Sequence, residues 1–343
     1  MEANANSKRI LIVGPSWVGD MVMAQSLFIA LKESNPDVIL DVLAMDWTRP
    51  LLQRMPEVDH AISMPISHGI FGWRMRKQLG TNLRKNHYDQ AIVLPNSWKS
   101  ALIPWFAKIP VRTGWRGEFR YGLLNDIRHL DKNTLPMMVQ RFVSLANPAA
   151  QADSKLNYRP PLMVGQSPRA DIDQIRSFPD QKRLILCPGA EFGPAKQWPT
   201  SHYAGLADHF LAAGWQVLIL GSKADEETAE EIISKTKYST GNLISLAGKT
   251  QLEDAIDLLG TADYVVSNDS GLMHIAAALH TPLIAVYGPT SPSFTPPLAD
   301  NAHITQIDIE CSPCFARTCP LSHHKCMTEL SVESVTHLIT ANL

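Results

Sequence analysis

A carboxylate stands in the first glycine loop of the chain, at the position where a nucleotide-binding loop would carry a lysine. Residues 14–20 read GPSWVGD; they follow an apolar run at 9–13 and precede helical apolar spacing at 21–32. A P-loop has the same glycine separation but continues with Lys and Ser or Thr, which hold phosphate and magnesium. Here Asp20 follows the glycine, so an anionic nucleotide would be repelled. At a helix start Asp20 stays ionised and can accept a proton from a substrate hydroxyl; the alternative is that it only caps the helix.

Two later loops carry features that suit phosphate. Residues 187–199 (CPGAEFGPAKQWP) leave an expected strand and place Lys196 just before a helix that begins near residue 199 or 200. Residues 267–274 (SNDSGLMH) leave another strand and open a small-residue helix at 275–279. Gly271 lets a ligand approach the backbone, and the free N–H groups at that helix start can hold a phosphate. Together the two loops predict a diphosphate site that needs no metal.

Each of these side chains also has a purely structural interpretation. Lys196 can be a solvated loop lysine, and Asp269 and Ser270 can cap the helix, which is compatible with ligand binding. His274 lies four residues after Ser270 on the same helix face, so it either reaches the ligand or packs within the helix.

The elements that must position these residues alternate between strand and helix twice along the chain. Apolar runs predict strands at 10–13, 39–43, 61–64, 91–94 and 111–113, and again at 184–187, 216–220, 243–245, 264–267 and 283–287. A final helix is expected at about 331–339, and the segment from about 147 to 179 has the composition of a linker. This pattern predicts two doubly wound α/β domains.

Composition excludes several classes of protein. The chain has 343 residues, 45% hydrophobic and 19% charged, which is typical of a folded protein of two domains. A formal net charge of −2 gives no overall case for nucleic acid. The N-terminus has no signal-peptide pattern and no apolar stretch reaches membrane-spanning length, so we expect a cytoplasmic protein whose cysteines are reduced.

The three loops, together with PNS at 95–97, RTGWRG at 112–117 and YGPT at 287–290, resemble glycosyltransferase family 9 over nearly the whole chain. The resemblance implies a GT-B fold, with two Rossmann-like domains facing across a cleft. It implies an acceptor domain at 1–160, an ADP-heptose domain at 161–330 and a C-terminal helix at 331–343. It also implies an inverting transfer of L-glycero-D-manno-heptose from ADP-heptose, with Asp20 as the base and no cofactor.

The acceptor implied by the resemblance is the lipopolysaccharide inner core, at the cytoplasmic face of the inner membrane. Ser270 stands where enzymes that add the first heptose tend to carry Thr, which favours heptosyl-Kdo2-lipid A as the acceptor. A transferase that adds the first heptose, or another ADP-heptose transferase, is the alternative. For the donor we predict contacts from Gly189, Glu191, Lys196, Ser222, Thr250, Asp269, Ser270, Gly271 and His274. For the acceptor we predict contacts from Ser16, Trp17, Arg74, Arg76, Lys77, Asn96, Ser97, Arg116 and Arg120.

Two of these predictions have open alternatives. Basic residues at 74, 76 and 77 follow the glycine-aromatic segment at 69–73, and those at 112, 116 and 120 bracket a second such loop. Both clusters would guide an anionic acceptor, or the residues at 74–77 form an ordinary solvated helix face. Cys311, Cys314, Cys319 and Cys326 would form a tetrahedral structural zinc site, a packed loop of thiols or a redox-formed bridge.

Other functions fit the sequence less well. A nicotinamide dehydrogenase needs a Gly-x-Gly-x-x-Gly fingerprint, which neither half of the chain carries. A two-lobed periplasmic sugar-binding protein needs an export signal. A sugar-nucleotide epimerase of GT-B fold is the closest alternative enzyme, since it would use the same donor site without an acceptor.

Overall fold

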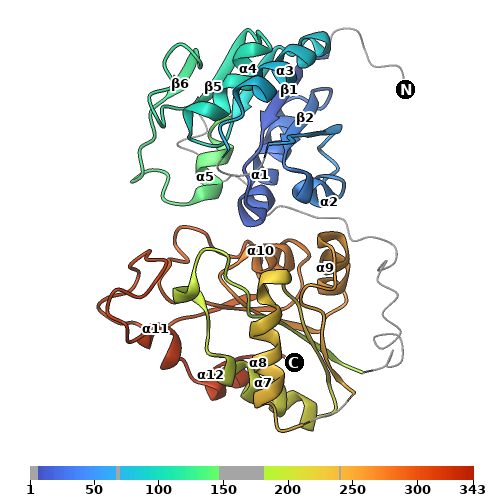
Figure 1. The fold of residues 1–343 in the computed structure, drawn as a ribbon, viewed down its shortest axis with the longest axis vertical. Coiled ribbons are helices and arrows are strands. Elements are labelled where there is room, and N and C mark those ends of the chain that lie inside the picture. Colours follow the sequence, from blue (N-terminus) through green and yellow to red (C-terminus); the bar gives the residue numbers. More distant parts are fainter. Residues whose placement is uncertain (1–6, 67–69, 147–180, 239–240) are drawn as a thin grey trace. The chain divides into compact units, whose positions relative to one another are not determined.

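The chain forms two compact α/β units, residues 1–163 and 164–343 (Figure 1). The computed structural model describes residues 7–66, 70–146, 181–238 and 241–343. The predicted domain boundary at residue 160 and the predicted linker from about 147 to 179 lie outside these described residues. Each unit is built around its own six-stranded sheet.

Unit 1 is a parallel sheet in the order β3-β2-β1-β4-β5-β6. Its strands are β1 (Arg9–Val13), β2 (Ile39–Ala44), β3 (His60–Ser63), β4 (Gln90–Val93), β5 (Val111–Trp115) and β6 (Asp126–Arg128). The strand order switches between β1 and β4: the chain adds β2 and β3 on one side of β1, and β4, β5 and β6 on the other. The connections that leave the carboxyl ends of β1 and β4 therefore run to opposite sides. Asp20 and the PNS segment follow these two strands, so the topology explains why both were expected at the functional edge.

The helices of unit 1 are α1 (Val18–Ser34), α2 (Arg49–Leu52), α3 (Trp73–Leu83), α4 (Leu102–Phe106) and α5 (Met138–Val143), with short 3₁₀ turns η1 (Asp46–Thr48), η2 (Arg84–Asn86) and η3 (Trp98–Ala101). Helix α1 is buried from Met21 to Phe28 and packs against α5, so the residues just before Met21 are held firmly. Helices α3 and α4 pack closely at Gly80, where a Cβ atom would lie 2.6 Å from the Ile103 carbonyl oxygen.

Unit 2 repeats the arrangement with the order β12-β11-β10-β7-β8-β9, again parallel. Its strands are β7 (Arg183–Cys187), β8 (Gln216–Ile219), β9 (Leu243–Ser245), β10 (Tyr264–Asn268), β11 (Leu283–Val286) and β12 (Ala302–Thr305). Strands β7 and β10 are neighbours, so the two loops singled out in the sequence leave the same edge of the sheet side by side.

The helices of unit 2 cover both faces of this sheet: α7 (Thr200–Ala212), α8 (Glu226–Lys235), α9 (Leu252–Leu259), α10 (Gly271–Ala278), α11 (Lys325–Thr328) and α12 (Val332–Thr340), with 3₁₀ turns η5 (Pro194–Lys196) and η6 (Lys223–Asp225). Helix α12 packs against α7 and buries Val335 and Ile339 in the core of unit 2. The C-terminal helix is therefore an integral part of this unit.

Every strand predicted from apolar runs is present, with ends that differ by a residue or two. The edge strands β6 and β12 were not predicted. Strand β6 has the sequence DIR and β12 the sequence AHIT, and both are partly exposed. Each of these two sequences has polar or charged residues in place of a continuous apolar run, so apolar patterning did not reveal β6 and β12.

Candidate active site

Asp20 is the third residue of α1 and is half-buried. The helix begins after Trp17, which occupies the cap position, so Asp20 lies in the first turn and not at the cap. Gly14 ends β1 and is confined, because a Cβ atom there would lie 2.7 Å from the Met21 Cε atom. The carboxylate therefore lies in the first turn of α1, at the positive end of the helix dipole.

Lys196 and Asp269 form a buried ion pair in unit 2. The Lys196 Nζ atom lies 2.6 Å from Asp269 Oδ2 and 3.3 Å from the Asp269 carbonyl oxygen. The hydroxyl of Thr290 donates to the same carboxylate oxygen at 2.6 Å. The two side chains are only 12% and 5% exposed, so this pair is not a solvated surface contact. The structure thus brings together the two loops predicted to form the donor site.

Thr290 is a member of this site that the sequence did not reveal as a contact. It follows β11 in the YGPT segment, one strand away from Asp269. Its position after the carboxyl end of a central parallel strand was the one sequence signal for a role in the site. A single Thr in a Pro-rich turn has no distinctive pattern of its own.

Ser270, Gly271 and His274 lie at the start of α10. Ser270 is the cap residue, and its Oγ atom lies 3.2 Å from Ser267 Oγ. His274 is buried, and this burial lowers the pKa of its imidazole to about 4; Asp269 opposes the shift and Lys196 adds to it. The side chain is therefore neutral at physiological pH. It is within electrostatic reach of the ion pair and is buried in the helix, and its predicted contact with the donor stays a prediction.

Asn268 locks the two loops to each other below the ion pair. Its amide nitrogen donates to the Pro188 carbonyl at 2.6 Å, and its amide oxygen accepts from the Trp198 backbone at 3.2 Å and the Tyr203 hydroxyl at 3.0 Å. The side chain is fully buried, and its amide nitrogen and its oxygen are both hydrogen-bonded inside the protein. Asn268 therefore fixes the geometry of the site and leaves ligand contact to its neighbours.

The other predicted donor residues lie on neighbouring loops. The backbone and hydroxyl of Ser222 donate to Asp225 Oδ2 at 2.7 and 2.8 Å, and a Cβ atom at Gly189 would lie 2.8 Å from the same oxygen. Asp225 thus joins the ends of β7 and β8. Thr250 donates weakly to Leu246 at 3.4 Å, and Glu191 is exposed. The structure does not bring Ser222, Thr250 or Glu191 into a contact with the Lys196 pair among the residues it describes.

Two of the arginines predicted to contact the acceptor serve the fold. Arg120 is fully buried, with its guanidinium donating to the carbonyls of Pro95, at 2.6 Å, and Trp115. Burial lowers the pKa of Arg120 to about 10, so it stays charged. Arg76 is 5% exposed and donates to the carbonyl of Phe71 at 2.7 Å. Because both buried guanidiniums donate to loop carbonyls, we do not propose Arg76 or Arg120 as acceptor contacts.

The remaining acceptor candidates are accessible. Arg74, Lys77, Asn96 and Arg116 are exposed, Ser16 and Ser97 are half-buried, and Trp17 is 43% exposed. The Ser16 carbonyl accepts from the Trp47 indole at 3.1 Å, and the Asn96 carbonyl accepts from the Glu118 amide at 3.1 Å. In both residues the backbone holds the loop while the side chain stays available.

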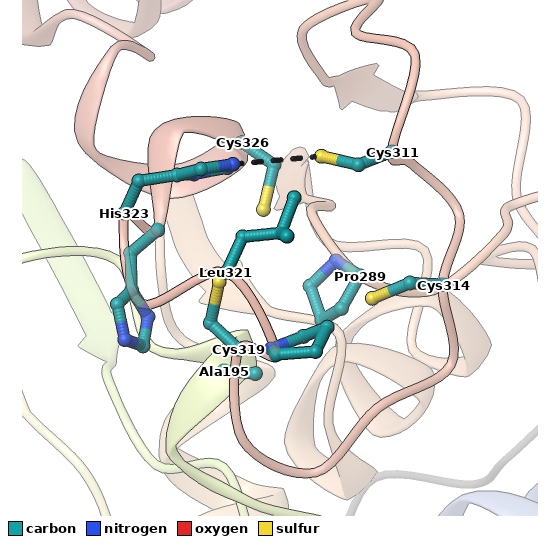
Figure 2. A pocket seen from close by; sticks show the side chains of 10 residues that line it. Ala195, Pro289, Cys311, Cys314, Cys319, Leu321, His323 and Cys326 are labelled. Atoms are coloured by element: carbon teal, nitrogen blue, oxygen red, sulfur yellow. Dashed lines mark hydrogen bonds between the residues drawn. The ribbon is translucent and has the colours of Figure 1, made fainter.

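The four cysteines of the 311–326 segment line one pocket with His323, Leu321 and Pro289 (Figure 2). Cys311 Sγ lies 3.9 Å from His323 Nε2, and all four cysteines are free thiols. Within the described ranges, no three His, Cys, Asp or Glu side chains are arranged to hold a metal ion. The zinc prediction is therefore not supported, and no disulfide joins these four cysteines.

Among the described helices, none is long and apolar enough to cross a bilayer.

The family model described as glycosyltransferase family 9 (heptosyltransferase) matches residues 76–325. The lipopolysaccharide heptosyltransferase 2 of Salmonella typhimurium is 50% identical over 306 residues, 87% of this chain and 88% of that protein. The lipooligosaccharide heptosyltransferase 2 of Haemophilus ducreyi is 52% identical over 310 residues, with the same coverage.

The fold agrees with a solved structure as well. The E. coli ADP-heptose lps heptosyltransferase II has a TM-score of 0.86 and 43% identity, covering 97% of this chain and 98% of that one. The two parallel-sheet units described above are therefore those of a GT-B protein, which confirms the fold class predicted from the sequence.

Proposed function

The chain belongs to glycosyltransferase family 9, the heptosyltransferases, and from this membership we propose that it transfers L-glycero-D-manno-heptose from ADP-heptose to the first heptose of a lipopolysaccharide inner core. The observation that carries the proposal is the buried Lys196–Asp269–Thr290 cluster beside the start of α10. It combines a cation, free helix N–H groups and hydroxyls, which is the chemistry that a sugar diphosphate needs. The reported relatives named heptosyltransferase 2 support the choice of the second heptose over the first.

In this proposal unit 2 binds the donor. Lys196 and the N-terminus of α10 at Gly271 stabilise the charge that develops on the departing ADP. The second oxygen of Asp269 accepts a hydrogen bond from a heptose hydroxyl, while its Oδ2 atom remains bound to Lys196 and Thr290. We assign the adenosine to the loops at Gly189, Ser222 and Thr250, next to this cluster along the sheet.

Unit 1 supplies the base and binds the acceptor. Asp20 accepts the proton of the attacking acceptor hydroxyl, and the hydroxyl oxygen displaces ADP from the anomeric carbon with inversion. A carboxylate at a helix start is a weak base in the resting enzyme, so it acts as the hydroxyl becomes acidic in the oxocarbenium-like transition state. Arg74, Lys77 and Arg116 are exposed and bind the carboxylates and phosphates of the inner core.

We extend the proposal to contact with the cytoplasmic face of the inner membrane, where a lipid-linked acceptor resides. Ile70, Phe71, Trp73 and Trp98 are each at least 41% exposed. The three aromatic rings form one cluster, with centroids 5.3 Å apart for Phe71–Trp98 and 6.0 Å for Phe71–Trp73. Exposed aromatic rings beside exposed basic residues are typical of a surface that rests on an anionic bilayer.

One assay tests the proposal. Purified protein is incubated with ADP-heptose, with and without a heptosyl-Kdo2-lipid A acceptor, and both ADP release and the mass of the lipid are measured. We expect ADP release that depends on the acceptor and one added heptose per lipid. Release of ADP or isomerisation of the sugar without acceptor would favour an epimerase, and transfer to a lipid that lacks heptose would favour addition of the first heptose.

A further inference from the structure

Arg317 lies against the loop that carries Lys196. The Arg317 carbonyl oxygen accepts a hydrogen bond from the Ala195 amide at 3.1 Å. At Gly193 a Cβ atom would lie 2.5 Å from the same carbonyl oxygen, so glycine is what permits this approach. The Arg317 backbone is therefore bonded to Ala195, the residue before Lys196, although Arg317 and Lys196 are far apart in the sequence.

The segment around Arg317 is also fixed to the other side of the donor site. The hydroxyl of Ser312 donates to the Gly288 carbonyl at 2.6 Å, and the Phe315 amide donates to the Pro289 carbonyl at 2.7 Å. These carbonyls immediately precede Thr290, which contacts the Asp269 carboxylate. The cysteine-containing segment thus bridges the two loops that build the site.

The side chain of Arg317 shares an aromatic ring with Lys196. The Arg317 guanidinium carbon lies 5.3 Å from the centroid of the Phe192 ring, and Lys196 Nζ lies 5.0 Å from the same centroid. Both cations are therefore held beside one ring, that of Phe192. Arg317 is exposed, and within the described part of the chain its guanidinium has no carboxylate partner.

The charge balance of the Lys196–Asp269 cluster indicates what Arg317 contributes. The positive charge of Lys196 is matched by Asp269 at 2.6 Å, and His274 is neutral because burial lowers its pKa to about 4. The buried charges of the cluster therefore cancel. A diphosphate carries more than one negative charge. Its transfer from water into a site without net positive charge costs desolvation free energy that no charge attraction offsets. The exposed Arg317 guanidinium supplies the net positive charge and the hydrogen-bond donors that the buried ion pair does not.

We propose that Arg317 binds the diphosphate of the donor directly, as a second cation beside Lys196. The assignment rests on the proposed function, because the diphosphate is that of ADP-heptose. Lys196 then neutralises Asp269 as well as stabilising the departing ADP, and Arg317 carries the net positive charge that attracts the ligand.

The test measures the binding of ADP, AMP and adenosine by isothermal titration calorimetry. We expect Arg317→Gln to weaken ADP binding by about 10- to 100-fold and to leave adenosine binding unchanged, since only contacts to phosphate are lost. Arg317→Lys should recover part of the ADP affinity, because it keeps the charge and loses the forked geometry. Lys325→Gln is the matched control: it removes a charge from the same unit at an exposed side chain that pairs with Glu329.

A second arm separates direct binding from a role in holding Lys196. In a Lys196→Ala background, Arg317→Gln should weaken ADP binding further. An unchanged ADP affinity there, or an equal loss for ADP and adenosine, would refute the direct contact while leaving the proposed function intact. A wild-type protein that does not bind ADP would refute both.

Discussion

At the scale of single residues, the Lys196–Asp269 pair serves both stability and binding. Each partner is buried, so removing one leaves the other charge without compensation. Lys196→Ala is expected to lower the free energy of unfolding by about 3 to 5 kcal/mol and to weaken ADP binding. The double variant Lys196→Ala/Asp269→Asn should regain most of the stability but not the ADP affinity. Urea unfolding and ADP titration of the same preparations check this; parallel recovery of both would argue against a binding role for Lys196.

Asp20 allows a cleaner separation of chemistry from binding. Asp20→Asn keeps the size of the side chain and removes its basicity, so turnover should fall by roughly 10²- to 10⁴-fold while the Kd for ADP stays unchanged. Asp46→Asn is a suitable control, because Asp46 lies in the same unit at an exposed turn, 4.0 Å from Arg49. Near-normal turnover of folded Asp20→Asn protein would remove this residue from the mechanism.

His274 predicts a pH dependence of stability. Burial lowers the pKa of its imidazole to about 4 from 6.5, so the unfolded chain binds this proton first as the pH falls. The stability contributed by the neutral imidazole is fully present above about pH 6.5 and is lost as the pH falls through about 4, a change on the order of 3 kcal/mol. Urea unfolding of wild type and His274→Gln, at about pH 7.5 and about pH 4, should show a smaller loss in the variant. An equal loss would mean that His274 is not the group that titrates.

At the scale of elements, close backbone contacts decide which loops can meet. Gly193 touches the Arg317 backbone, and Gly193→Ala should push the two loops apart. We expect weaker ADP binding and a loss of stability of about 1 to 3 kcal/mol. Gly241→Ala is the matched control, because a Cβ atom there meets no atom within 4 Å. If both variants bind ADP as the wild type does, the contact at Gly193 has no part in shaping the site.

The elements also explain what sequence patterns could and could not reveal. Lys196 and Asp269 were predictable because Asp269 directly follows β10 and Lys196 lies in the loop that leaves β7, and these two strands are parallel neighbours. Arg76 and Arg120 were not, because residue type and spacing say nothing about whether a guanidinium faces solvent or folds back onto loop carbonyls. The role of the 311–326 segment was missed for a related reason, since its contacts are made mostly by the backbone.

At the scale of the whole molecule, two sheets of the same topology carry different chemical groups. Both sheets could be predicted from the sequence, because central parallel strands are apolar runs. The polar strands β6 and β12 at their edges could not. Unit 1 presents Asp20 with exposed basic and aromatic side chains, and unit 2 presents a buried ion pair with an exposed arginine. This difference predicts that substitutions in the two units affect different substrates.

The sharpest form of that prediction concerns the exposed basic residues of α3. The double variant Arg74→Gln/Lys77→Gln removes two charges from unit 1, so it should raise the KM for an anionic lipid acceptor and weaken the dependence of that KM on salt. The Kd for ADP should not change, because the donor contacts belong to unit 2. Lys85→Gln/Lys132→Gln removes the same charge from other exposed positions of unit 1 and should leave both constants unaltered. Steady-state kinetics with a phosphorylated inner-core acceptor at several salt concentrations gives the answer. An unchanged acceptor KM in the α3 variant would mean that these two side chains form a solvated helix face, and a changed ADP affinity would mean that the units do not divide the substrates in this way.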